Sequence, residues 1–195
     1  QEHPIKPLGS LPEDAWLTGF NMDYADMDND GKLDVVSTVW PGYLIWLKHP
    51  QSPKEGWELF MIGDMLPDQL VSVALEDIDS DGDLDAFSGS YSRGPRNQDG
   101  FNIGVNDPLG RISWFENIEN SISWTRHDIT RKKRGMYDKW VSRDLDFDGD
   151  PDFIGTRGNS EPYDGVIWIE QVRSKKSLKN FLKARENDSL EMPLP

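Results

Sequence analysis

The chain has 195 residues, with 35 Asp and Glu against 21 Lys and Arg, so its formal net charge is −14. This acidity argues against a nucleic-acid-binding protein, because phosphate recognition needs a basic surface. The absence of cysteine excludes a disulfide framework and Cys-ligated zinc. With 8 Trp, 8 Phe and 5 Tyr, the chain also differs from acidic disordered segments, which are poor in aromatic residues. Its length suits one domain or two small ones.

In chain order, the strongest pattern is an acidic loop that occurs three times, at residues 26–34, 77–85 and 144–152. Each loop reads Asp-x-Asp-x-Asp-Gly-x-x-Asp, and the loops begin 51 and 67 residues apart. A long repeat with insertions of variable length is therefore indicated. One such loop could be a solvated acidic turn, but three equivalent loops favour a shared binding role.

The spacing of the carboxylates has a chemical reason. Side chains at positions 1, 3 and 5 of a tight loop converge, the glycine at position 6 permits the turn, and the position-7 carbonyl and position-9 carboxylate complete an oxygen cage. Hard oxygen ligands in a flexible loop suit Ca²⁺, whereas Mg²⁺ prefers a tighter octahedron with retained waters. An EF-hand is excluded, because Ser37, Ser88 and Gly155 occupy position 12, where that motif requires a bidentate Glu.

Strand-like segments follow each loop. Residues 35–40, 86–91 and 153–156 come directly after the loops, and aromatic segments follow at 43–47, 111–115 and 165–169. Alternating apolar segments starting with Trp occur at 57–62 and 124–129. Four short antiparallel strands per repeat predict an all-β fold built of propeller blades. We place these blades at residues 1–172 and a C-terminal tail at 173–195, with a short amphipathic helix around Leu178, Phe181 and Leu182.

On these loops and strands, residues 20–172 resemble the FG-GAP/VCBS repeat family, whose blades carry an Asp-rich calcium loop, as in the propeller of integrin α-subunits. The resemblance implies three Ca²⁺ sites. Their side-chain ligands would be Asp26, Asp28, Asp30 and Asp34; Asp77, Asp79, Asp81 and Asp85; and Asp144, Asp146, Asp148 and Asp152. Their main-chain ligands would be the carbonyls of Lys32, Asp83 and Asp150. Pro151 departs from the pattern at position 8, which supplies no ligand.

Three blades cannot close a propeller, which typically needs four to eight. Residues 2–5 repeat the His-x-Ile spacing of residues 127–129, so they are expected to end the last strand of a preceding blade, while the third repeat lacks its own last strand. A frayed tail is the alternative for residues 2–5. The expected partners are other copies of the chain or the missing blades of a longer chain.

Two further segments could carry a ligand. The Gly/Asn/Pro-rich stretch at 92–110 is the longest insertion, and long loops on rigid scaffolds often bind ligands. A basic run at 131–134 lies near other polar residues that suit an acidic sugar, although a solvated basic loop is the alternative. The candidate ligand-binding residues are Arg134, Tyr137, Lys139, Arg157, Asn159 and Tyr163.

The sequence thus predicts an extracellular or cell-surface calcium-binding propeller that serves as a binding or structural assembly module, with acidic glycans as candidate ligands. Weak calcium loops fill only where calcium is near millimolar, which is outside the cytosol. The alternative is a propeller-type polysaccharide lyase or sugar dehydratase with His127, Tyr137, Lys139 and Arg157 as candidate catalytic groups. His127 is expected to pack at a strand end, because His3 stands at the matching position of the repeat.

Overall fold

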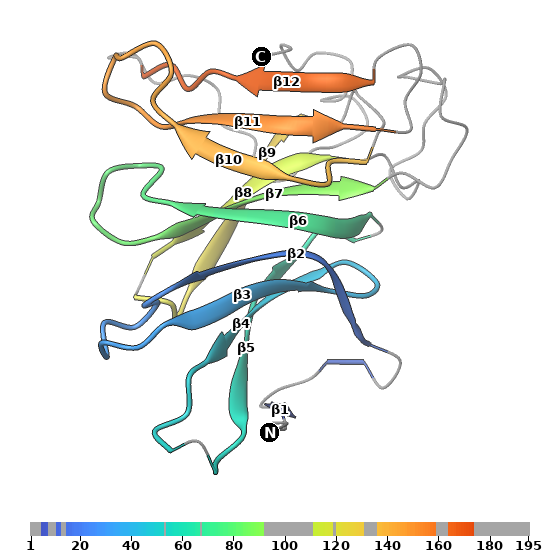
Figure 1. The fold of residues 1–195 in the computed structure, drawn as a ribbon, viewed down its shortest axis with the longest axis vertical. Helices are drawn as coiled ribbons and strands as arrows, with labels where there is room; N and C mark the ends of the chain where they lie inside the picture. Colours follow the sequence, from blue (N-terminus) through green and yellow to red (C-terminus); the bar gives the residue numbers. More distant parts are fainter. Residues whose placement is uncertain are drawn as a thin grey trace.

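A computed structural model describes residues 5–7, 11–12, 15–52, 54–66, 68–91, 111–118, 120–130, 136–158 and 164–173. Within these ranges every regular element is a β-strand, and the strands form three sheets stacked in chain order (Figure 1). The all-β prediction is therefore confirmed. The predicted C-terminal helix lies outside the described residues.

The first sheet contains β1 (Ile5–Pro7), β2 (Leu17–Ala25), β3 (Asp34–Val39), β4 (Tyr43–Lys48) and β5 (Trp57–Asp64), in the order β1-β5-β4-β3-β2. Strands β2 to β5 form the expected antiparallel blade. Strand β1 runs parallel to β5 and pairs Ile5 with Trp57. The end of a preceding blade was expected near Ile5, but the structure places this residue on the outer edge of the first sheet.

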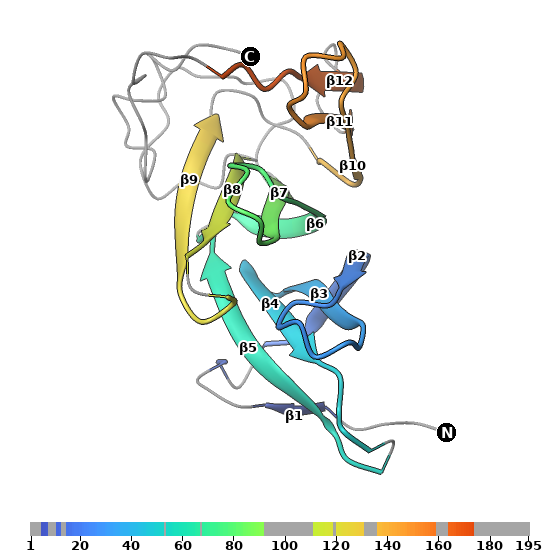
Figure 2. The same cartoon turned by 90° about the vertical axis from the view of Figure 1, so that its left-hand side faces the viewer.

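The second sheet contains β6 (Gln69–Glu76), β7 (Asp85–Tyr91), β8 (Ile112–Asn117) and β9 (Trp124–Thr130), which pair sequentially and antiparallel. The third contains β10 (Trp140–Arg143), β11 (Asp152–Arg157) and β12 (Gly165–Ile169). In the part of the chain that the structure describes, this third sheet has three strands. Strands β2, β6 and β10 lie along one side of the molecule, and the long outer strands β5 and β9 lie along the other (Figure 2).

The sheets pack face to face through two apolar clusters. The first cluster lies between the first and second sheets, and the second lies between the second and third. In the second cluster the ring of Phe87 stacks on Phe153 at 3.8 Å and meets Trp140 edge-on at 4.9 Å. Gly155 is needed beside Trp140, because an added Cβ would lie 2.3 Å from the indole. The three blades form an open stack, and the described residues do not close a ring.

Candidate metal sites

The three acidic loops occupy equivalent places in the fold. Each loop connects the first antiparallel strand of a blade to the second, so the loops join β2 to β3, β6 to β7 and β10 to β11. All three lie along the same edge of the stack, at the left of Figure 1. The repeated loop sequence thus corresponds to a repeated position in three dimensions.

The aspartate at position 9 holds each loop to its sheet. Asp34, Asp85 and Asp152 are all fully buried. In each case Oδ2 accepts a hydrogen bond from the backbone N–H of loop position 2, at 3.1 Å from Met27, 2.9 Å from Ile78 and 3.1 Å from Leu145. In each case Oδ1 accepts a second one at the end of the third strand, at 2.7 Å from His49, 2.8 Å from Asn117 and 2.9 Å from Gln171. The sequence predicted these residues as ligands but missed this structural role.

The backbone of each loop turns through two left-handed residues. Position 6 is Gly31, Gly82 or Gly149, with φ of 84°, 97° and 97°. Position 4 is Asn29, Ser80 or Phe147, with φ of 59°, 66° and 63°. Glycine adopts this conformation readily, whereas a bulky residue does so only at a cost in free energy. The turn therefore depends on both positions, and the sequence motif revealed only the glycine.

The turn brings carboxylates together. In the second loop, Asp77 accepts hydrogen bonds from the N–H groups of Asp81 at 3.1 Å and Gly82 at 3.2 Å, and the first loop repeats this pattern. Each loop then gathers three carboxylates whose oxygens lie within 4.8 Å of one another: Asp26, Asp28 and Asp34; Asp77, Asp79 and Asp85; and Asp144, Asp146 and Asp148. The first two loops therefore unite positions 1, 3 and 9, whereas the third unites positions 1, 3 and 5.

Two buried carboxylate oxygens fit a cation at these loops. Oδ1 of Asp28 in the first loop and Oδ1 of Asp83 in the second are buried and have no hydrogen-bond partner. Buried polar atoms are normally satisfied, so an orphaned carboxylate oxygen beside other carboxylates supports a cation at that place. An all-oxygen donor set of this kind is the one that Ca²⁺ prefers.

The second loop carries uncompensated negative charge. Burial raises the pKa of Asp85 to about 7; hydrogen bonds from Asn117 and Ile78 oppose the shift, and the charges of Asp79 and Asp83 add to it. Burial, followed by the charges of Asp81 and Asp79, raises the pKa of Asp83 to about 6. Burial is the main cause of both shifts, and the neighbouring carboxylate charges add to it.

The first loop differs because two lysines neutralise part of it. The ammonium group of Lys48 contacts Asp28, and its Nζ lies 3.8 Å from Oδ2 of Asp30. Nζ of Lys32 lies 3.5 Å from the same Asp30 oxygen. Burial would raise the pKa of Asp30, but the backbone N–H of Lys32 and the two ammonium groups together lower it. Glu116 stands at the position of Lys48 in the second blade.

An arginine links the second and third loops. Nε of Arg173 lies 2.8 Å from Oδ1 of Asp150 in the third loop. Its Nη2 donates to the carbonyl of Ile78 at 3.0 Å and to Oγ of Ser80 at 2.7 Å, both in the second loop. Neighbouring loops are thus joined by direct contacts between blades.

The candidate sugar-binding and catalytic residues do not form an open surface within the described residues. Tyr137 and Arg157 are 1% and 3% exposed, and the Tyr137 ring stacks on Trp140 at 5.7 Å. His127 is buried, stacks on Trp114 at 4.6 Å and places Nε2 2.6 Å from Oε2 of Glu116. It packs in the middle of β9 rather than at the strand end that was expected. Lys139 is exposed. Three further candidates lie outside the described residues: Arg134, Asn159 and Tyr163.

A buried ionic network was not predicted from the sequence. Nε of Arg111 lies 2.7 Å from Oδ2 of Asp68, and Arg126 binds both carboxylate oxygens of Asp128 at 2.7 and 2.9 Å. Oγ of Ser113 donates to Asp128 as well, at 2.5 Å. In the sequence, only the alternation of Arg126 and Asp128 on one strand indicated such a network, because Asp68 comes from a distant loop. The balanced charges indicate a structural role.

Three consecutive sheets with acidic loops along one edge define a propeller-like repeat protein. Residues 26–88 match the family model of the FG-GAP-like repeat, so this stretch, from the first loop into β7, is an FG-GAP-like repeat, as the sequence predicted. Comparison with curated proteins found no match. In the part of the chain that the structure describes, no helix is long and apolar enough to cross a membrane.

Proposed function

We propose that the protein is an extracellular calcium-binding propeller module that assembles with further blades through the two end faces of its stack. The repeated geometry of the three acidic loops carries the calcium part of this proposal. FG-GAP repeats are typical of extracellular proteins, and weak calcium loops fill where calcium is near millimolar.

The ion would supply positive charge to each cluster of carboxylates and stabilise the folded state by mass action. In the second loop Asp77, Asp79 and Asp85 would hold it, with Asp81 and the carbonyl of Asp83 completing the set. The raised pKa values of Asp83 and Asp85 and the orphaned Asp83 oxygen support a cation at this place.

Exposed apolar side chains on the two end faces support the assembly part. On the third sheet, Val141 is 44% exposed, Val166 74% and Trp168 50%. Their repeat counterparts in the second sheet, Ala74, Ile112 and Trp114, pack against the third sheet. On the first sheet, Met22 and Tyr24 are 53% and 65% exposed, and the counterpart of Met22 is the buried Val73. Part of each end face thus exposes positions that the inner interfaces bury. The rest of the outer face of the first sheet is already covered, because Ile45 and Leu59 are buried there against Leu11 and Ala15.

Thermal unfolding with calcium and with a chelator tests the metal part. Calcium at about 100 times its Kd should stabilise the folded state by about 2.7 kcal/mol for each site. Asp79→Asn should remove the calcium-dependent stabilisation of one site. Glu55→Gln changes an exposed acidic residue outside the loops and should leave the stabilisation by calcium unchanged. A melting temperature that is the same with calcium and with chelator would show that the loops bind no calcium.

Light scattering tests the assembly part. A head-to-tail contact between end faces predicts a particle larger than one chain, and Trp168→Glu should reduce its mass. Ile122→Glu is the matched control, because Ile122 is 81% exposed but lies in the β8–β9 connection rather than on an end face. A wild-type protein that stays monomeric at high concentration contradicts self-assembly without affecting the calcium proposal.

A further inference from the structure

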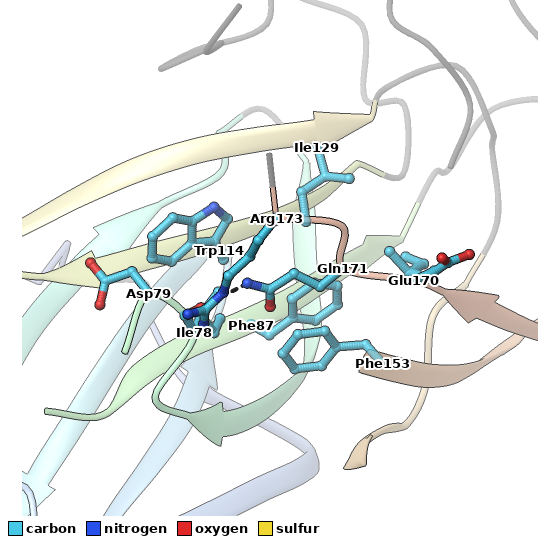
Figure 3. Close-up of a pocket in the computed structure, with 10 residues that line it drawn as sticks. Ile78, Asp79, Phe87, Trp114, Ile129, Phe153, Glu170, Gln171 and Arg173 are labelled. Atoms are coloured by element: carbon cyan, nitrogen blue, oxygen red, sulfur yellow. Dashed lines mark hydrogen bonds between the residues drawn. The ribbon is translucent and has the colours of Figure 1, made fainter. Parts of the chain in front are cut away.

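A cavity of about 450 Å³ lies between the second and third sheets (Figure 3). Its apolar walls come from Phe87, Trp114 and Ile129 on the second sheet and from Phe153 and Ile169 on the third. Figure 3 shows Gln171 and Arg173 on one side of it, following β12. A cavity of this size in an otherwise packed interface indicates a missing side chain or strand.

The equivalent interface between the first and second sheets is filled by a tryptophan. Trp124, the first residue of β9, packs against the cluster that contains Trp46 and Phe115, and its Nε1 donates to the carbonyl of Ser121 at 3.3 Å. When the blades are aligned on their third strands, Trp114 of the second blade corresponds to Trp46 of the first. Ile169 of the third blade corresponds to Phe115 of the second. The cavity therefore lies where the third sheet would place the first residue of a fourth strand.

The edge of the third sheet is also open at this point. Strand β8 pairs with β9 on its outer side, whereas β12 pairs only with β11 among the described residues. An open strand edge offers backbone N–H and C=O groups that an extended segment can satisfy. Cavity and edge together fit one extended strand.

We propose that residues 178–183 of this same chain are that fourth strand. In the first two blades, the Trp that starts the fourth strand follows the third-strand Trp by 11 residues (Trp46 to Trp57) or 10 residues (Trp114 to Trp124). Leu178 follows Trp168 by 10 residues. The chain continues far enough beyond Arg173 to reach the cavity without a long connection.

A second spacing agrees with this assignment. Three residues after its first Trp, each fourth strand carries a ring that stacks on the third-strand Trp: Phe60 on Trp46 at 4.4 Å, and His127 on Trp114 at 4.6 Å. Phe181 lies three residues after Leu178, where it would stack on the half-exposed Trp168. Leu178 and Leu182 would then point to the opposite face, toward the cavity.

This arrangement differs from the amphipathic helix that the sequence suggested for the same residues. In a helix, Leu178, Phe181 and Leu182 share one face, because residues three and four apart are neighbours. In a strand, Phe181 points away from the two leucines. The two alternatives therefore place different residues opposite β12.

Cysteine pairs in the 195-residue chain test the register, because its sequence contains no cysteine. Ile45 faces Met61 in the first blade and Ser113 faces Asp128 in the second, so Ile167 should face Leu182. Directly opposed strand residues lie about 4.5–5.5 Å apart at Cα, which suits a disulfide. Ile167→Cys with Leu182→Cys should form an intramolecular disulfide on mild oxidation.

The matched control pairs Ile167→Cys with Lys179→Cys, which a strand would separate by about 10 Å along its axis. Selective crosslinking of the first pair within one chain supports the proposal. A disulfide-linked dimer would show that a second copy supplies the strand, and equal or absent crosslinking of both pairs would show that residues 178–183 do not pair with β12. Each of these two outcomes overturns the proposal.

Filling the cavity provides an independent measurement. Leucine is smaller than the tryptophan at the equivalent position, so Leu178→Trp should raise the melting temperature of the 195-residue chain. Lys179→Trp, on the opposite face of the proposed strand, should not raise it. Equal effects of the two substitutions would exclude the cavity as the site of Leu178.

Discussion

The first and second acidic loops share one backbone but differ in charge. Both gather the carboxylates of positions 1, 3 and 9, and both are tied to their sheet by a buried position-9 aspartate. Position 7 is Lys32 in the first loop and Asp83 in the second. Lys48 contacts the first loop, whereas Glu116 occupies the corresponding position in the second blade.

This difference separates two roles of the motif. The hydrogen bonds of the position-9 aspartate are the same in both loops, so the shape of the loop does not depend on its net charge. The affinity for a cation is expected to depend on the net charge of the loop. Lysines neutralise part of the first loop, whereas burial and repulsion between carboxylates raise the pKa values of Asp83 and Asp85 in the second. The second loop is therefore expected to bind calcium more tightly than the first.

The largest effect is expected from removing a position-9 aspartate. Asp85→Ala leaves two buried N–H groups without an acceptor, and hydrogen bonds to charged groups contribute about 1.5–3 kcal/mol each. We expect a loss of roughly 3 kcal/mol or more in the free energy of unfolding, measured in urea with a chelator present. Asp34→Ala should cost a similar amount despite the different charge of its loop.

Asp79→Ala is the control, since Asp79 is exposed and holds no strand end in place. With chelator it should change stability by only about 0.5 kcal/mol. If Asp85→Ala costs no more than Asp79→Ala, the position-9 aspartate does not have the structural role assigned to it.

The second loop should also make calcium binding depend on pH. The folded pKa values of Asp83 and Asp85 lie above the ordinary value of 3.8, so the folded, metal-free chain holds protons that the unfolded chain releases. Above pH 7 both carboxyl groups are charged in the metal-free folded protein and destabilise it most. Below pH 7, calcium must displace their protons in order to bind. The stabilisation by calcium should therefore be larger at pH 8 than at pH 5, by on the order of 1–2 kcal/mol.

Melting curves at both pH values, each with calcium and with chelator, measure this difference. Asp83→Asn should reduce the pH dependence, because it removes one titrating group next to the site. A calcium increment that is equal at pH 5 and pH 8 would contradict the charge distribution described for the second loop.

The repeat was predictable from the sequence because its loops and strands are local features. The Asp-rich motif, the alternation after it and the Trp at 46, 114 and 168 each lie within a short stretch of chain, and together they define the blades. Features that join distant segments were not predictable. The bond from Asp85 to Asn117 spans 32 residues and that from Ser72 to the carbonyl of Tyr137 spans 65. The burial of Tyr137 and Arg157 likewise depends on packing between sheets.

Removing the lysine of the first loop should make the two loops more alike. Lys48→Gln takes away the ammonium group that contacts Asp28 and leaves that carboxylate to a metal ion. Because one surface charge pair contributes up to about 1 kcal/mol, we expect calcium affinity to rise about fivefold at this loop. Isothermal titration in a background of Asp79→Asn and Asp146→Asn, in which the second and third sites are disabled, isolates the first loop. Lys54→Gln, exposed and outside the loop, should have no effect.

The smallest effect is expected at position 4, where the loops differ in side chain rather than in charge. Asn29, Ser80 and Phe147 all have positive φ. Asparagine tolerates the left-handed conformation, because its short polar side chain bonds locally, whereas the conformation is costly for a bulky residue. Phe147 is also 90% exposed, so its ring contributes little packing in return.

Phe147→Asn should therefore stabilise the metal-free protein, by about 0.5–1 kcal/mol, measured as a rise in the urea midpoint with an unchanged slope. The reverse change in the first loop, Asn29→Phe, should destabilise by a similar amount, because it places a bulky residue at a φ of 59°. If both substitutions are neutral, the loops adopt another backbone in solution. If Phe147→Asn alone is destabilising, the Phe147 ring is buried against a partner at the loop edge of the stack.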